Sequence, residues 1–121
     1  MKPASLFALI GLAALAAPIR AGDAGDAAGR GLYEARCGGC HALDADRVGP
    51  RHAGVFGRKA GSVAGFAYSS ALAQSRIVWG DDTLERWLRD PEALIPGQRM
   101  NFRVSDPAER RAIVDFLRTA R

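Results

Sequence analysis

Two cysteines and a histidine stand within five residues of one another, in the run CGGCH at residues 37–41. Two thiols at this spacing can each add across a vinyl group of a haem, and a histidine that directly follows the second thiol then lies beneath the iron as its ligand. The chain has only two cysteines and two histidines in 121 residues, so chance rarely produces this pattern. The sequence therefore predicts one haem c, attached covalently through Cys37 and Cys40, with His41 as an iron ligand.

Three other uses of these residues stay open at the level of the sequence. A thioredoxin-like dithiol shares the Cys-x-x-Cys spacing but requires a βαβ context. A disulfide between Cys37 and Cys40 would close a loop too small to stabilise the fold much. A zinc ion on both cysteines, His41 and His52 would have four ligands, but the adjacent Cys40 and His41 suit a tetrahedral ion poorly. Haem attachment is therefore the favoured interpretation.

The second axial position on the iron separates an electron carrier from a catalyst. A methionine sulfur would close this position, whereas an open position would permit oxygen or peroxide chemistry. Met1 and Met100 are the only methionines, and Met1 belongs to the expected leader segment. Met100 follows the turn signal Pro96-Gly97 in a loop that can reach across the haem. The sequence thus predicts Met100 as the second ligand, with His52 as its competitor.

The first residues have the composition of a secretory signal. After Lys2, residues 5–17 are apolar and uncharged, and a small-residue cleavage site ends at Ala21. This apolar run is shorter than the roughly 20 residues that a membrane-spanning helix needs. We expect residues 1–21 to be a signal peptide and residues 22–121 to form a single domain in a bacterial periplasm, because thioether attachment of haem takes place outside the cytoplasm.

The composition is that of one small globular domain, with 48% hydrophobic and 25% charged residues. Loss of the leader removes Lys2 and Arg20 and lowers the formal net charge from +4 to +2. Arginines and acidic residues are interspersed, which argues against a nucleic-acid partner because such partners need a clustered basic face. A domain of this size with Gly-rich loops buries little surface alone, so a covalent haem would supply the centre of its core.

Hydrophobic periodicity predicts an all-α fold, because no segment has the pattern of a strand. The last helix has the clearest signals, with Asp106 as N-cap, Pro107 at the first helical position and Glu109 placed for a capping box. The expected elements are a helix from about Asp26, a Gly- and Pro-rich loop to about Phe66, a short helix over 68–74, a helix capped by Asp81 or Asp82 and stopped by Pro91, a loop over 92–105 and the last helix.

Five motifs occur in order along the chain: CGGCH, then GPRHAGVFGRKAG at 49–61, GFAYSSAL at 65–72, IVWGDDTLERWL at 77–88 and PEALIPGQRMNF at 91–102. Together they resemble the class I c-type cytochromes, in particular the branch of mitochondrial cytochrome c and its bacterial relatives. The resemblance covers nearly all of the chain after the leader, from Gly29 to Phe116. It implies a small cytochrome c fold, in which helices and loops pack around one haem and the terminal helices cross.

The resemblance also implies roles for further residues. The carbonyl of Pro50 would accept a hydrogen bond from His41 and orient the imidazole, and Phe102 would shield the haem edge. The positions that help to stabilise a buried haem propionate in the family are Arg58, Tyr68 and Trp79. The crossing of the terminal helices would bring Gly29 and Tyr33 against Ile113 and Phe116.

The expected function is outer-sphere electron transfer by a soluble periplasmic carrier that is not an enzyme, with iron cycling between ferric and ferrous states under His41 and Met100 ligation. Its partners would be redox proteins. The carrier itself would be a monomer that forms transient complexes with them, and it would have no membrane span after the leader is removed. Arg36 and Arg99 would flank the haem edge and steer an acidic partner surface. The alternatives are a dedicated cytochrome subunit of a periplasmic dehydrogenase or oxidase, and a haem enzyme or sensor with an open sixth position.

Overall fold

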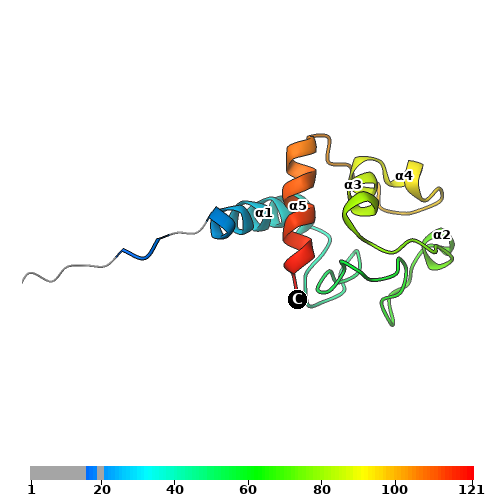
Figure 1. The fold of residues 1–121 in the computed structure, drawn as a ribbon. Coiled ribbons are helices and arrows are strands. Elements are labelled where there is room, and N and C mark those ends of the chain that lie inside the picture. Colours follow the sequence, from blue (N-terminus) through cyan, green and yellow to red (C-terminus); the bar gives the residue numbers. More distant parts are fainter. Residues whose placement is uncertain (1–15, 19–20) are drawn as a thin grey trace, which may run out of the picture.

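The structure, a computed structural model, describes residues 16–18 and 21–121. The signal peptide expected over 1–21 lies mostly outside these residues. The described part contains five helices: α1 (Ala21–Cys37), α2 (Ser70–Ala73), α3 (Asp81–Arg89), α4 (Pro91–Leu94) and α5 (Pro107–Thr119) (Figure 1). Its only extended pairing is an isolated antiparallel bridge between Lys59 and Val78. The predicted all-α fold class is confirmed, and none of the described helices is long and apolar enough to cross a membrane.

The first and last helices cross, as the resemblance implied (Figure 1). A Cβ built at Gly29 would lie 2.6 Å from the carbonyl oxygen of Ala112 and 3.0 Å from Cβ of Phe116, so only glycine allows this close approach. The ring of Tyr33 lies 5.1 Å from that of Phe116, and Ile113 is fully buried beside them. This contact holds α1, whose last residue is Cys37, against α5.

Gly29→Ala should lower the free energy of unfolding by about 2 kcal/mol, because its methyl group meets backbone that cannot move aside. The matched control is Gly31→Ala in the same helix, where an added Cβ has no neighbour within 4 Å. That control should raise stability by up to about 1 kcal/mol through helix propensity. Chemical denaturation of the haem-loaded variants measures both, and equal stability of the two would contradict the crossing contact.

Two helices begin at positions that differ from the sequence-based expectation. Helix α1 starts at Ala21 rather than near Asp26. Once packed against α5, a helix extends at little cost through Ala-rich sequence, although its glycines weaken the local signal. Helix α3 has Gly80 as its N-cap rather than Asp81 or Asp82. The backbone N–H of Gly80 donates to the hydroxyl of Thr83 (2.8 Å), while the two aspartates lie in the first turn, where the helix dipole favours negative charge.

The expected loop over 92–105 begins instead with the short helix α4. Asp90 caps this helix by accepting a hydrogen bond from the backbone N–H of Ala93 (3.2 Å). Pro91 stops α3 because it lacks an N–H, and its fixed φ suits the first position of the next helix. One residue therefore ends one helix and starts another.

The predicted cap of α5 is confirmed, but the capping box is not closed by the residue expected to close it. Asp106 accepts hydrogen bonds from the backbone N–H groups of Ala108 (2.7 Å) and Glu109 (3.2 Å). The carboxylate of Glu109 instead accepts from both Nε (3.0 Å) and Nη2 (2.9 Å) of Arg36. This bidentate pair joins α1 to α5.

The core lies where α1, α3 and α5 meet the long loop between α1 and α2. Trp79 and Trp87 pack with ring centroids 5.3 Å apart, and both are buried. The loop contributes Val55 and Ala60 to the same cluster. Cys37 belongs to this cluster too, so the Cys37–His41 segment begins inside the packed core.

Candidate haem-binding site

The two cysteines lie on one tight turn at the end of α1. The backbone N–H groups of Cys40 (3.1 Å) and His41 (2.8 Å) both donate to the carbonyl oxygen of Cys37. A Cβ at Gly38 would lie 2.5 Å from the carbonyl oxygen of Glu34, so this turn needs glycine there. Both cysteines are free thiols, Cys37 buried and Cys40 exposed. The turn therefore carries two thiols that are separated by two residues.

The raised pKa of the Cys37 thiol argues against a redox-active dithiol. Burial, with a smaller contribution from Cys40, raises the pKa of Cys37 to about 11, so its thiol is protonated at neutral pH. Thioredoxin-like dithiols have a lowered thiol pKa and sit in a βαβ unit. The described residues contain no strand. Neither condition for the dithiol alternative is met.

The imidazole of His41 is held by backbone on two sides. Its Nδ1 lies 2.8 Å from the carbonyl oxygen of Pro50, within hydrogen-bond distance. A Cβ at Gly49 would lie 2.1 Å from Cε1 of this ring and 2.6 Å from each ring nitrogen. Burial lowers the pKa of His41, although the Pro50 carbonyl opposes the shift, so the ring is neutral. With the Nδ1 hydrogen donated to Pro50, the lone pair on Nε2 is available to a metal.

His52 stacks on this imidazole. The ring centroids of His41 and His52 are 3.9 Å apart and their planes differ by 20°. The hydroxyl of Tyr33 and Nδ1 of His52 are hydrogen-bonded at 3.2 Å. Burial, followed by the effects of His41 and Arg58, lowers the pKa of His52 to about 3, which keeps it neutral. The sequence singled out both Tyr33 and His52 but gave no sign that they pair.

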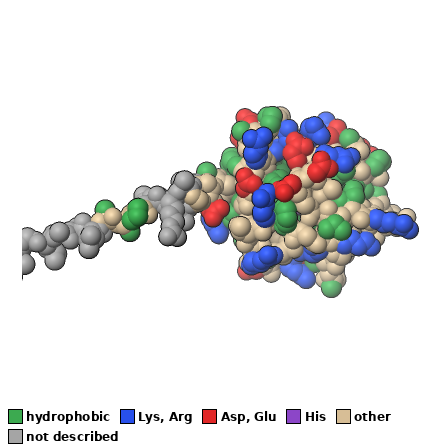
Figure 2. All heavy atoms as spheres, viewed as in Figure 1, with side chains coloured by type: hydrophobic (Ala, Val, Ile, Leu, Met, Phe, Trp, Pro, Cys, Tyr) green, Lys and Arg blue, Asp and Glu red, His purple; other side chains and the backbone are tan. Residues whose placement is uncertain are grey.

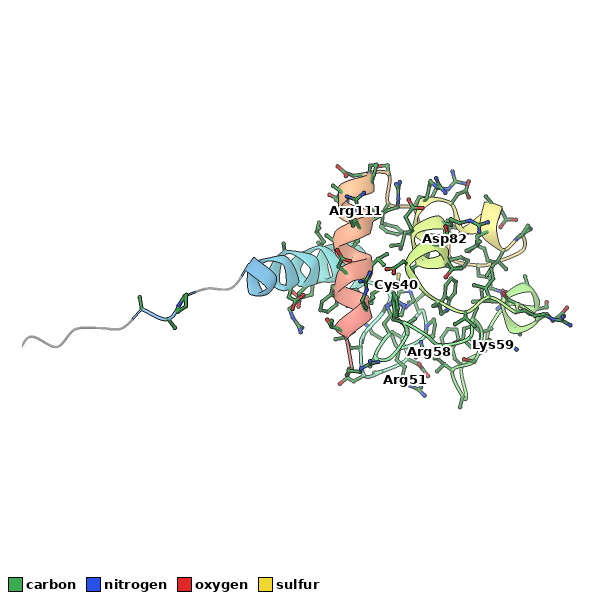
Figure 3. The ribbon with its side chains drawn as sticks, in the orientation of Figure 1. Cys40, Arg51, Arg58, Lys59, Asp82 and Arg111 are labelled. Atoms are coloured by element: carbon green, nitrogen blue, oxygen red, sulfur yellow. The ribbon has the colours of Figure 1, made fainter. Side chains whose placement is uncertain are left out.

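The three residues assigned to a propionate converge beside the long loop. The backbone N–H of Trp79 donates to the carbonyl oxygen of Arg58 (2.9 Å). Burial lowers the pKa of Arg58, although the nearby Tyr68 opposes the shift. Arg58 donates to the carbonyl oxygens of Arg51 (2.8 Å) and Ala53 (3.1 Å), and Figure 3 shows both arginines at the same end of the molecule. A half-buried guanidinium so placed is suited to meet an anionic group.

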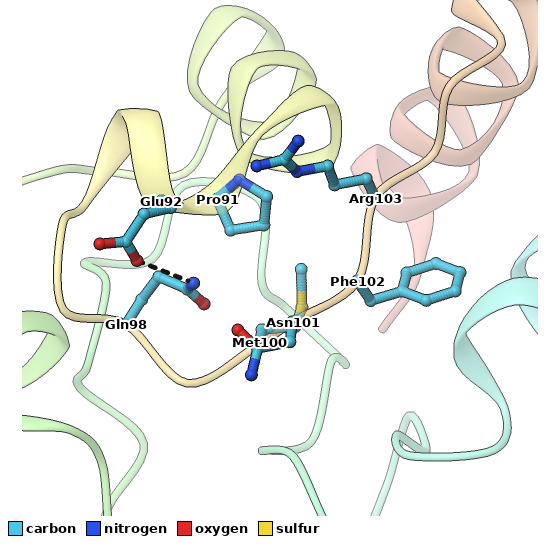
Figure 4. A pocket seen from close by; sticks show the side chains of 7 residues that line it. All are labelled: Pro91, Glu92, Gln98, Met100, Asn101, Phe102 and Arg103. Atoms are coloured by element: carbon cyan, nitrogen blue, oxygen red, sulfur yellow. Dashed lines mark hydrogen bonds between the residues drawn. The ribbon is translucent and has the colours of Figure 1, made fainter.

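Met100 and Phe102 lie in the loop between α4 and α5. Met100 lines a pocket of about 200 Å³ (Figure 4), together with Pro91, Glu92, Gln98, Asn101, Phe102 and Arg103. The Gln98 amide donates to the carboxylate of Glu92 (3.1 Å) and ties the start of this loop to α4. Phe102 is 41% exposed, and Figure 4 shows its ring turned away from the Met100 side chain. Met100 is half-buried and packs against the hydrophobic core.

Arg110 secures the other end of the Met100 loop, which the sequence analysis missed. This arginine of α5 is buried, and its Nε donates to Glu85 of α3 (2.8 Å). Its Nη1 donates to the carbonyl oxygens of Val104 and Ser105, both at 2.8 Å. The neighbouring Arg111 is exposed, so residue type and helical position alone did not distinguish the two.

These observations fit a haem better than a metal ion alone. The described residues contain no cluster of three or more Cys, His, Asp or Glu side chains that could hold a metal, so the zinc arrangement is not assembled there. Two thiols on one turn, an imidazole with Nε2 unclaimed and a half-buried guanidinium match the attachment, axial and propionate groups of a haem. The bare Gly49 leaves room for the His41 imidazole.

Residues 27–121 match the family model for cytochrome c. The chain belongs to the cytochrome c family. A cytochrome c of Arabidopsis thaliana is 44% identical over 93 residues, which cover 74% of this chain and 83% of that protein. The cytochrome c2 iso-2 of Magnetospirillum fulvum is 42% identical over 86 residues, covering 69% and 90%. The solved structure of cytochrome cH from Methylobacterium extorquens has a TM-score of 0.73 and 38% identity, covering 78% of this chain and 97% of that one.

Family membership confirms the predicted cofactor. Cytochromes c bind one haem c covalently through a cysteine pair, and Cys37 and Cys40 have that spacing in this chain. The small cytochrome c fold with crossing terminal helices is confirmed as well. The protein is a class I cytochrome c, an electron carrier.

Proposed function

We propose that this cytochrome c carries single electrons in the bacterial periplasm, with His41 and Met100 as the axial ligands of its haem iron. A bound haem supplies the one-electron ferric–ferrous couple. The observation that carries the proposal is the hydrogen bond between Nδ1 of His41 and the carbonyl of Pro50 (2.8 Å), which leaves Nε2 as the metal-binding atom. The neutral, half-buried imidazole needs no proton loss to act as a ligand.

Met100 is preferred to His52 as the second ligand because of where His52 lies. His52 is stacked on His41 and hydrogen-bonded to Tyr33, so it sits on the same side of the site as the first ligand. With His41 as one ligand, a second ligand would come from a segment other than the one that carries His41 and His52. Met100 comes from a separate loop and is the only methionine outside the expected leader. Closure of both axial positions favours electron transfer over catalysis at the iron.

Met100→Leu should abolish the weak far-red sulfur-to-iron charge-transfer band of the ferric protein. It should also lower the reduction potential, because methionine ligation raises it. The absorption spectrum and a redox titration of the periplasmically expressed protein measure both. His52→Leu, which removes the competing ligand, should leave the band in place. A parent protein that lacks the band, or whose ferrous form binds carbon monoxide, would move the proposal to a haem enzyme or sensor.

The charged surface supports contact with an acidic redox partner, and it favours Arg47 over Arg36 as the neighbour of the expected Arg99. Arg36 is occupied by Glu109, in an ion pair of 2.9 Å. Within the described part of the chain, Arg99 and Arg47 have no carboxylate at ion-pair distance, and Arg47 donates to the carbonyl of Gly38 on the attachment turn (2.7 Å). Figure 2 shows basic and acidic side chains interspersed elsewhere on one face. Arg47 would therefore steer the partner to the attachment turn, and Arg99 would add a second positive charge beside Met100.

The proposed location rests on the sequence of residues 1–21, which has the apolar run and cleavage site of a signal peptide. Haem attachment outside the cytoplasm agrees with export. The similarity to the cytochrome c2 of Magnetospirillum fulvum supports a bacterial carrier of this kind.

A further inference from the structure

Three side chains from separate segments of the chain are linked at the site, two by ring stacking and two by a hydrogen bond. Tyr33 comes from α1, while His41 and His52 come from the two ends of the loop segment that follows the attachment turn. The Tyr33 hydroxyl is 3.2 Å from Nδ1 of His52, and the His52 ring lies 3.9 Å from that of His41 with an interplanar angle of 20°. A hydrogen bond and a ring stack thus connect α1 to the iron-binding imidazole.

The backbone contacts of His41 do not by themselves determine the plane of its ring. The Pro50 carbonyl fixes the position of Nδ1, and Gly49 closes the Cε1 edge. A single hydrogen bond at one ring atom still permits the imidazole to tilt about that atom, because the distribution of angles at a carbonyl oxygen is broad. A second ring stacked on its face removes this freedom. His52 is the group that supplies the stacked face.

His52 can restrict His41 only if its own ring is held. Tyr33 is 4% exposed, and its ring packs 5.1 Å from Phe116 at the crossing of α1 and α5. The hydroxyl therefore projects from a rigid part of the core. Two apolar side chains would fill the same space, but a satisfied buried polar pair specifies one mutual orientation where apolar packing accepts several.

We propose that Tyr33 and His52 form a positioning pair that sets the plane of the His41 imidazole, and through it the ligand field at the haem iron. Tyr33 holds His52 through the hydrogen bond, and His52 holds His41 through the stack. The role rests on the proposed ligation of iron by His41. It predicts that a substitution in α1, with no contact to the haem ligand, alters the magnetic environment of the haem.

The first test is Tyr33→Phe in the haem-loaded ferric protein, followed by proton NMR of the paramagnetically shifted haem methyl groups. The change removes one oxygen and keeps the ring that packs on Phe116. We expect the order and spread of the methyl resonances to change while the far-red band is retained. Ile113→Val is the control, because it removes one buried methyl group from the same crossing and so lowers stability, while the hydroxyl of Tyr33 and the ring of His52 are unchanged. The control should leave the methyl pattern unchanged.

His52→Leu provides the second variant, since it replaces the stacked imidazole with an apolar side chain of similar size. It should shift the methyl resonances in the same sense as Tyr33→Phe, and the double variant should add little to either single change. Methyl patterns identical to the parent in both single variants, with only a lowered denaturation midpoint, would overturn the proposal and leave the pair as core packing. Fully additive shifts would overturn it too. Met100 ligation is read separately from the far-red band of the same samples, so failure of the axial-ligand proposal is distinguished from failure of the positioning role.

Discussion

Gly49→Ala is expected to displace His41 and to convert the ferric haem from low-spin to high-spin. The added methyl group would lie 2.1 Å from Cε1 and 2.6 Å from both ring nitrogens, far inside van der Waals contact. The imidazole cannot retreat without losing its hydrogen bond to Pro50 or its stack with His52. Groups that orient a metal-bound histidine typically contribute 10–100-fold to metal binding, so the Fe–His bond should weaken by about that factor.

Absorption and electron paramagnetic resonance spectra of the ferric protein measure this change in spin state. The control is Gly39→Ala, a glycine of the attachment turn itself, where an added Cβ has no neighbour within 4 Å. This control should keep the low-spin spectrum and the far-red band. A low-spin spectrum in Gly49→Ala, identical to that of Gly39→Ala, would contradict the close approach of Gly49 to the imidazole.

Arg110→Met is expected to lower the free energy of unfolding by about 3 kcal/mol. Removal of the guanidinium leaves the carbonyl oxygens of Val104 and Ser105 without their donor and separates α5 from Glu85. Loss of one partner of a fully buried ion pair costs about 3–5 kcal/mol. Glu85 is about a third exposed and also pairs with Arg89 (3.5 Å), so its share of this cost is reduced by solvent. The two carbonyl oxygens left without a donor account for much of the remaining loss in the free energy of unfolding.

In Arg110→Met, the loop that carries Met100 should unfold at a lower denaturant concentration than the rest of the protein. Val104 also donates its backbone N–H to the carbonyl of Leu88 (2.8 Å), so the segment is held at one end by α3 and Arg110 together. In urea, we expect the far-red band of Arg110→Met to disappear at a lower concentration than the helical circular dichroism signal. Arg111→Met, one position along at an exposed site, should change stability by no more than about 0.5 kcal/mol. Equal stability of the two variants would show that the buried contacts of Arg110 contribute little.

Local features of this protein followed from residues that are close together in the chain. The CGGCH run places its thiols on one turn because the Cys37 carbonyl accepts from two backbone N–H groups only a few residues away. Asp106 caps α5 in the same way, by accepting from the two N–H groups that lie two and three residues further on. Interactions of this range depend on residue type and spacing alone, so the attachment site, the last helix and the all-α class were predictable.

Helix boundaries were less predictable, because they depend on how neighbouring segments compete. Two aspartates follow Gly80, and either suits an N-cap by type, yet the hydroxyl of Thr83 satisfies the Gly80 N–H and starts α3 one residue earlier. Pro91 signals a stop, but the side chain of Asp90 makes it a start as well. Sequence patterns rank such caps by preference, and small differences in free energy then decide among them.

Contacts between distant side chains were decided by the tertiary structure. Tyr33 and His52 are 19 residues apart, and Arg36 and Glu109 are 73 apart, so no spacing rule relates them. Arg36 was assigned to a partner surface because it stands beside Cys37. The crossing of α1 and α5 instead brings its guanidinium into an ion pair with Glu109. The sequence determined the cysteine pair that attaches the haem, and it predicts the iron ligands. Packing of the helices decided which polar groups are buried together, because burial removes water as the competing partner and makes each remaining hydrogen bond specific.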